Sequence, residues 1–89
     1  MRILLAEDDF VTRKFMMNFL SSYGECDAAV DGMEAVDAYL MALEDGEPYD
    51  LACLDIMMPV MDGYQVLRSI RDLEADHGIP EEEQVKVIM

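Results

Sequence analysis

LDIMMPVMDG, residues 54–63, places one carboxylate, Asp55, at the end of a short apolar run and follows it with a proline-broken loop. A second acidic segment, Glu7-Asp8-Asp9, closes another apolar run near the N-terminus, residues 3–6. In a parallel α/β sheet the carboxyl ends of neighbouring strands open into one crevice, where ligands bind. If the two runs are neighbouring strands, we expect their carboxylates to meet there.

Carboxylates that meet in this way repel one another unless a hard cation lies among them, and Mg2+ prefers carboxylate and carbonyl oxygens. An aspartate held beside Mg2+ can also act as a nucleophile toward phosphorus. Acidic residues at strand-to-helix junctions are also common as helix caps, and this explanation is favoured for Asp31 and Asp62. For Asp8 and Asp9 the two explanations are equally good. Asp55 favours a functional site, because a charge that closes so apolar a strand is costly unless it is paired or functional.

Composition limits the classes of function. With 89 residues and 53% hydrophobic content, the chain is expected to form one domain at most, with a modest core. The net charge of −14 argues against direct contact with nucleic acid or with an anionic membrane surface. There is no apolar stretch near the roughly 20 residues of a membrane span and no signal peptide, so a cytoplasmic location is expected. Cys26 and Cys53 are interpreted as small buried hydrophobic residues.

Apolar runs alternate with helical patterns along the chain, which is typical of βαβ units. Strands are predicted at about residues 2–6, 25–29, 51–55 and 85–89. Helices are predicted at about residues 10–22, from 31 or 32 to 43, and 63–76. The acidic stretch from Glu74 to Gln84 is predicted to be a solvated surface loop, and His77 within it is given no role.

Three segments carry a resemblance to a known family: the acidic segment 7–9 after its strand, AVDGMEA at residues 29–35, and residues 50–63. In order and spacing they resemble the receiver domain of two-component response regulators, over residues 2–89. The resemblance implies an α/β fold, a flavodoxin-like doubly wound parallel sheet with strand order 2-1-3-4-5. The sequence stops at the fourth predicted strand, so we expect residues 1–89 to be an incomplete receiver domain without the fifth strand and the last two helices.

The resemblance also implies a metal site with named ligands. Asp9 would bind Mg2+ directly, Asp8 directly or through water, and Met57 through its backbone carbonyl. Asp55 would be both a ligand and the phospho-acceptor. Glu7 matches a position that is often acidic in the family but is not counted among the ligands.

The predicted helix at residues 10–22 carries too many apolar residues for one buried stripe. One face at helical spacing is expected to pack on the sheet: Met16, Phe19, Leu20 and, one turn earlier, Thr12. The resemblance implies that this helix docks a histidine kinase or a histidine phosphotransfer protein, with four candidate residues: Phe10, Val11, Arg13 and Met17. The alternative is that some of these residues are covered by a neighbouring helix.

Three functions compete at this stage. The leading hypothesis is a phospho-accepting receiver, in which Asp55 takes a phosphoryl group in a Mg2+-dependent phosphorelay reaction. Such a protein is a switch and a phosphotransfer substrate rather than a metabolic enzyme. The alternative is a truncated fragment that is not phosphorylated and that dimerises or exchanges domains through an exposed fourth strand, because the family's phosphate-binding Ser/Thr and Lys would follow residue 89. An aspartate-nucleophile phosphatase is set aside, because Met57 stands where those enzymes carry a second Asp.

Overall fold

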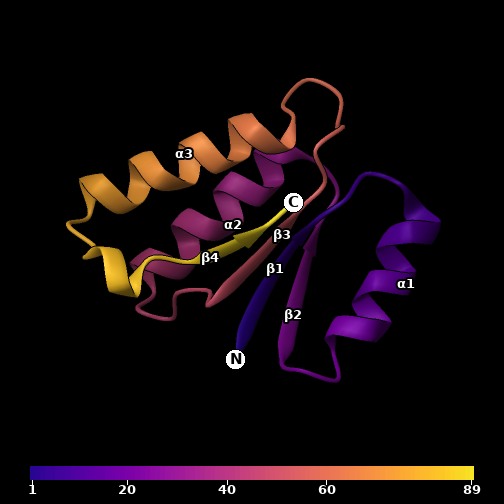
Figure 1. The fold of residues 1–89 in the computed structure, drawn as a ribbon, viewed down its shortest axis with the longest axis horizontal. Helices are drawn as coiled ribbons and strands as arrows, with labels where there is room; N and C mark the ends of the chain where they lie inside the picture. Colours follow the sequence, from indigo (N-terminus) through magenta and orange to yellow (C-terminus); the bar gives the residue numbers. More distant parts are fainter.

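Four parallel strands in the order β2-β1-β3-β4 form the centre of the molecule, in a computed structural model that describes all residues 1–89 (Figure 1). The strands are β1 (Arg2–Ala6), β2 (Glu25–Ala29), β3 (Leu51–Leu54) and β4 (Lys86–Ile88). The helices are α1 (Phe10–Leu20), α2 (Gly32–Glu44), α3 (Gly63–Asp76) and a 3-10 turn, η1 (Glu81–Glu83). The predicted doubly wound parallel sheet and its strand order are therefore confirmed over these strands, and the element boundaries differ from the predicted ones by two residues at most.

The two central strands, β1 and β3, are buried on both faces of the sheet, and their successive side chains point to opposite faces. β1 contributes Leu4 and Ala6 to a large cluster under α2 and α3, and Ile3 and Leu5 to a small cluster under α1. Figure 1 shows α1 on the opposite side of the sheet from α2 and α3. None of the helices is long and apolar enough to span a membrane.

The buried face of α1 differs from the predicted one. Leu20 is buried, and Met16 and Met17 pack against the small cluster, whereas Phe19 is 53% exposed and Thr12 is also exposed. Each residue turns a helix by about 100°, so a stripe through Met17 and Leu20 rotates Phe19 outward. The ring of Phe19 instead lies 5.4 Å from that of Tyr23, centroid to centroid.

The two cysteines lie in strands on either side of β1 and form no disulfide. Cys26 is paired with Ile3, and Cys53 is paired with Leu5. Cys53 is buried and Cys26 is half-buried. Burial is the largest cause that raises the pKa of both thiols, which makes them poor nucleophiles. The interpretation of Cys53 as a buried hydrophobic residue is confirmed.

Glu74 lies in α3 and is completely buried, so the prediction of a solvated stretch from residue 74 is wrong at its first residue. Its Oε2 accepts hydrogen bonds from the Tyr39 hydroxyl at 2.7 Å and from the Val85 N–H at 2.8 Å. Its Oε1 accepts from Nη1 of Arg71 at 2.7 Å. The carboxylate is therefore fully paired and connects α2, α3 and the start of β4.

The same contacts protect part of the outer edge of the sheet. The N–H of Lys86 donates to Asp50 beside β3, so by alternation the polar groups of Val85 point away from β3. The Val85 N–H donates to Glu74, and its carbonyl accepts from Arg71 at 3.0 Å. Side chains of α3 thus satisfy the outward-facing polar groups of the residue that leads into β4.

Candidate functional site

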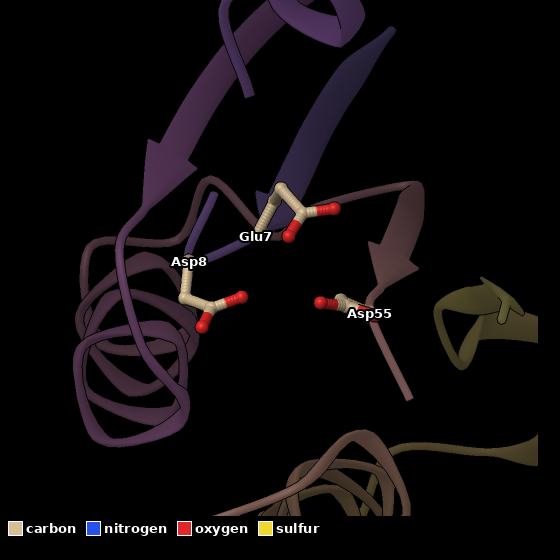
Figure 2. Close-up of side chains that lie close together, drawn as sticks. All are labelled: Glu7, Asp8 and Asp55. Carbon is tan, nitrogen blue, oxygen red and sulfur yellow. The ribbon is translucent and has the colours of Figure 1, made fainter. Parts of the chain in front are cut away.

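Three carboxylates meet at the carboxyl edge of the sheet: Glu7, Asp8 and Asp55 (Figure 2). β1 and β3 are adjacent, and their last residues, Ala6 and Leu54, are directly paired. The residues that follow each strand therefore emerge side by side. One oxygen from each of the three carboxylates lies within 4.8 Å of the other two. The predicted meeting of the two acidic segments is observed.

Asp9 is not part of this group, although the sequence predicted it as a direct ligand. Its Oδ2 accepts a hydrogen bond from the Thr12 N–H at 2.8 Å and caps α1. This hydrogen bond is the main cause that lowers the pKa of Asp9. The capping role that was also predicted for Asp9 is confirmed, and Glu7 takes its place in the group. The signal for Glu7 was its position, because it is the first residue after the strand.

Glu7 is half-buried, and its Oε2 accepts a hydrogen bond from the Asp9 N–H at 3.2 Å. Its pKa is raised above the ordinary value, mainly because burial disfavours the charged form. The neighbouring carboxyl groups of Asp55 and Asp8 raise it further, against the opposing effect of the Asp9 hydrogen bond. The group is therefore an electrostatically unfavourable arrangement that a cation would relieve.

The loop after Asp55 is folded back onto it. Oδ1 of Asp55 accepts a hydrogen bond from the Met57 N–H at 3.2 Å, and the Gly63 N–H donates to the Ile56 carbonyl at 3.1 Å. A side chain at position 63 would place its Cβ 2.5 Å from the carbonyl oxygen of Asp55, so only glycine allows this approach. Asp62 then caps α3 as predicted, in a capping box with Gln65.

The loop contains one strained residue, Val60, whose φ is 69° and whose side chain is 93% exposed. The Met61 N–H donates to the Pro59 carbonyl at 2.7 Å, which closes a three-residue turn around Val60. β-branched residues rarely adopt positive φ, because Cβ then approaches the backbone too closely. Because the Val60 side chain is exposed, it gains no buried contacts that would compensate for this backbone strain.

Replacing Val60 by asparagine is expected to stabilise the protein by about 1 kcal/mol, because asparagine tolerates positive φ and no packing is lost. Urea unfolding followed by circular dichroism would measure the change. Val11, also an exposed valine but in a helix, is the matched control, and Val11→Asn should change stability by less than about 0.5 kcal/mol. A Val60→Asn protein that is less stable than wild type would contradict the conclusion that Val60 is strained.

The donor set of the site suits a hard divalent cation. All three side chains are carboxylates, and neither histidine nor cysteine contributes to the group. Mg2+ is bound by oxygen ligands of this kind, whereas zinc sites usually include nitrogen or sulfur. The two ion pairs of the structure, Arg2–Asp27 and Arg71–Glu74, lie elsewhere, so no basic side chain forms an ion pair with the three carboxylates.

Residues 3–89 match the family model of the response regulator receiver domain. The chain belongs to this family. The receiver domain is 36% identical to the probable histidine kinase 2 of Oryza sativa subsp. indica, over 89% of this chain and 8% of that protein. It therefore spans less than a tenth of the length of this curated relative.

Solved structures agree with the family. The receiver domain of the histidine kinase CKI1 from Arabidopsis thaliana, complexed with Mg2+ and BeF3-, superimposes with a TM-score of 0.78 at 31% identity. That match covers 89% of this receiver domain and 60% of the Arabidopsis chain. A CheY-like receiver domain from Methanospirillum hungatei JF-1 gives a TM-score of 0.70 at 26% identity, over 99% of this chain and 62% of that one.

The predicted docking residues of this receiver domain fall into two groups. Phe10 and Val11 are 66% and 73% exposed at the start of α1, beside the carboxylates. Met17 packs against the sheet instead, and Arg13 is half-buried with its guanidinium turned toward the β1–α1 loop. An exposed patch on α1 therefore includes the first two residues and excludes Met17.

Proposed function

We propose that this receiver domain accepts a phosphoryl group on Asp55 from the phosphohistidine of a histidine kinase or a histidine phosphotransfer protein, in a Mg2+-dependent reaction. The observation that carries the proposal is the position of Asp55 at the end of β3, with Glu7 and Asp8 within 4.8 Å, in a chain of the receiver family. Curated relatives that are histidine kinases and a solved relative complexed with Mg2+ support it.

Glu7, Asp8 and Asp55 would hold Mg2+, together with the backbone carbonyl of Met57. Bound there, Mg2+ would neutralise the carboxylates and the oxygens of the incoming phosphoryl group. This proposed set includes Glu7 in place of Asp9, because Oδ2 of Asp9 caps α1, and the direct ligation by Asp9 that the sequence suggested stays a competing prediction. Asp9 contributes indirectly, since its N–H holds the side chain of Glu7.

In the proposed step an oxygen of the Asp55 carboxylate attacks phosphorus, and the bond between phosphorus and the histidine nitrogen breaks. The Met57 N–H orients the attacking carboxylate through Oδ1. The phosphoryl group would add negative charge at the base of the β3–α3 loop, which changes the surface that partners meet. The protein then acts as a switch and a phosphotransfer substrate rather than as a metabolic enzyme.

Intact mass spectrometry with acetyl phosphate and Mg2+ tests this function. Wild type is expected to gain one phosphoryl group, and the gain should disappear with EDTA or in Asp55→Asn. Asp62→Asn is the matched control, because asparagine also caps helices, and it should be phosphorylated like wild type. A gain that persists in Asp55→Asn would contradict the assignment of the acceptor, and no gain in wild type would contradict the function.

The alternative, assembly through the β4 edge without phosphorylation, remains a prediction. The structure reduces its support, because β4 is short and α3 already satisfies the polar groups of Val85. The same spectra recorded under native conditions separate the two functions. A dimer whose mass does not respond to acetyl phosphate would favour assembly.

A further inference from the structure

The side chain of Arg13 holds the backbone of the two carboxylate-bearing residues that follow β1. Its Nη1 donates one hydrogen bond to the Glu7 carbonyl at 3.0 Å and one to the Asp8 carbonyl at 3.2 Å. Both hydrogens of this nitrogen are thereby used. No other hydrogen bond of the structure reaches these two carbonyls. The guanidinium carbon also lies 5.7 Å from the centre of the Phe10 ring, which covers it on one side.

These contacts influence the directions in which the side chains of Glu7 and Asp8 point. The carbonyl orientations of Glu7 and Asp8 set the peptide planes on either side of Asp8, and those planes set the directions of the two Cα–Cβ bonds. The loop is held at its ends by the Glu7 N–H on the Ala29 carbonyl, at 3.1 Å, and by the Asp9 cap. Between these points Arg13 is the only donor to the two carbonyls, and the one other restraint is the bond from the Asp9 N–H, in the same peptide unit as the Asp8 carbonyl, to Oε2 of Glu7.

We propose that Arg13 is a positioning residue for the carboxylate group, and that it strengthens the binding of a divalent cation by fixing the orientation of Glu7 and Asp8. This inference rests on the proposed function, because it concerns the same Mg2+ site. The docking role that the sequence predicted for Arg13 stays a separate prediction. The hydrogen bonds of Arg13 go to carbonyl oxygens, so the carboxylate oxygens stay available to the cation.

The sign of the effect distinguishes positioning from simple electrostatics. A positive charge beside a cation site repels the cation, so removing it should tighten binding. A positioning role predicts the opposite, because the loss of a supporting hydrogen bond loosens the ligands. Lys14 provides the matched comparison, since it is the next residue, is exposed and makes no hydrogen bond or ion pair.

Calorimetric titration of the whole chain with MgCl2 tests the proposal. Arg13→Met, which keeps an apolar stem without charge or donors, is expected to bind Mg2+ roughly 10-fold more weakly than wild type. Lys14→Met is expected to bind equally well or slightly more tightly. Wild-type or tighter affinity in Arg13→Met would overturn the proposal. If that variant does not fold, Arg13→Lys keeps the charge on a flexible stem that ends one atom short of Nη1, so it should hold the two carbonyls less well and still bind Mg2+ more weakly than wild type. Unchanged affinity in Arg13→Lys would overturn the proposal.

A second measurement needs no metal. In backbone NMR spectra recorded without Mg2+, Arg13→Met is expected to shift the carbonyl resonances of Glu7 and Asp8, and Lys14→Met is expected to leave them in place. Unshifted carbonyls in Arg13→Met would overturn the positioning role. If wild type itself gives no heat with MgCl2, the proposed Mg2+ site fails, and these spectra still decide whether Arg13 orients the loop.

Discussion

Glu74→Ala is expected to lower the free energy of unfolding by about 3–5 kcal/mol, because it leaves two buried donors without an acceptor, at a cost of about 1–3 kcal/mol each, and removes a fully buried side chain. The substitution leaves the hydroxyl of Tyr39 and the N–H of Val85 buried without acceptors, and Arg71 without its partner. A domain of this size has roughly 5–10 kcal/mol of stability in total, so the loss is a large part of it.

Thermal unfolding measures the change directly. A loss of 3 kcal/mol corresponds to a fall of roughly 12–24 °C in Tm for a domain of this length. Glu74→Gln should fall in between, because a glutamine oxygen can still accept from Tyr39 but no longer pairs with the charge of Arg71. Asp72 lies on the same helix and is exposed, so Asp72→Ala serves as the control and should cost less than about 0.5 kcal/mol. Equal Tm values for Glu74→Ala and Asp72→Ala would contradict the role of Glu74.

Asp8→Asn is expected to weaken Mg2+ binding roughly 30-fold, which corresponds to about 2 kcal/mol for one charge lost about 4 Å from a divalent ion in water. The same substitution at Asp9 is expected to change the dissociation constant less than about 3-fold. Asparagine preserves the cap of α1, and the carboxylate of Asp9 lies outside the group of three. Calorimetric titration of the two variants and wild type with MgCl2 at one ionic strength compares them.

The pair of variants separates two assignments that differ by one residue. With Asp9 as the direct ligand, as the sequence suggested, Asp9→Asn would lose at least as much affinity as Asp8→Asn. With Glu7 in the group, Glu7→Gln should be impaired alongside Asp8→Asn. A larger loss in Asp9→Asn than in Glu7→Gln would contradict the site as the structure arranges it. The fold of each variant is checked by its circular dichroism spectrum.

The sheet, its strand order and Asp55 at the end of β3 were predictable from the sequence. The strands and Asp55 follow from local patterns, namely the apolar runs and the one charge that ends the most apolar of them, whereas the strand order was implied by the resemblance to receiver domains. The choice between Glu7 and Asp9 was harder, because three consecutive acids give no indication of which one the helix uses as its cap. Geometry decides this, since Asp9 lies where its carboxylate reaches the Thr12 N–H.

Two other features depend on contacts that are distant in the sequence. Glu74 lies in an acidic stretch that looks solvent-exposed, and its partners Tyr39 and Val85 lie 35 and 11 residues away. The hydrogen bonds of Arg13 join residues that are close in the sequence. Their acceptors are backbone carbonyls, however, and no sequence pattern indicates which carbonyl a side chain will bind. The outward rotation of Phe19 follows from the packing of Met17, which an apolar helix cannot specify when most of its faces are hydrophobic.

The bonds from α3 to Val85 also influence how the molecule opens. Local unfolding proceeds in cooperative units, and the ends of a sheet normally detach first. Here the segment that leads into β4 cannot detach at Val85 without also exposing the Glu74 carboxylate and releasing the hydroxyl of Tyr39 in α2. Local unfolding of the edge strand therefore also requires breaking the contact between α2 and α3. The amide protons at its N-terminal end should exchange with solvent as slowly as those of the interior.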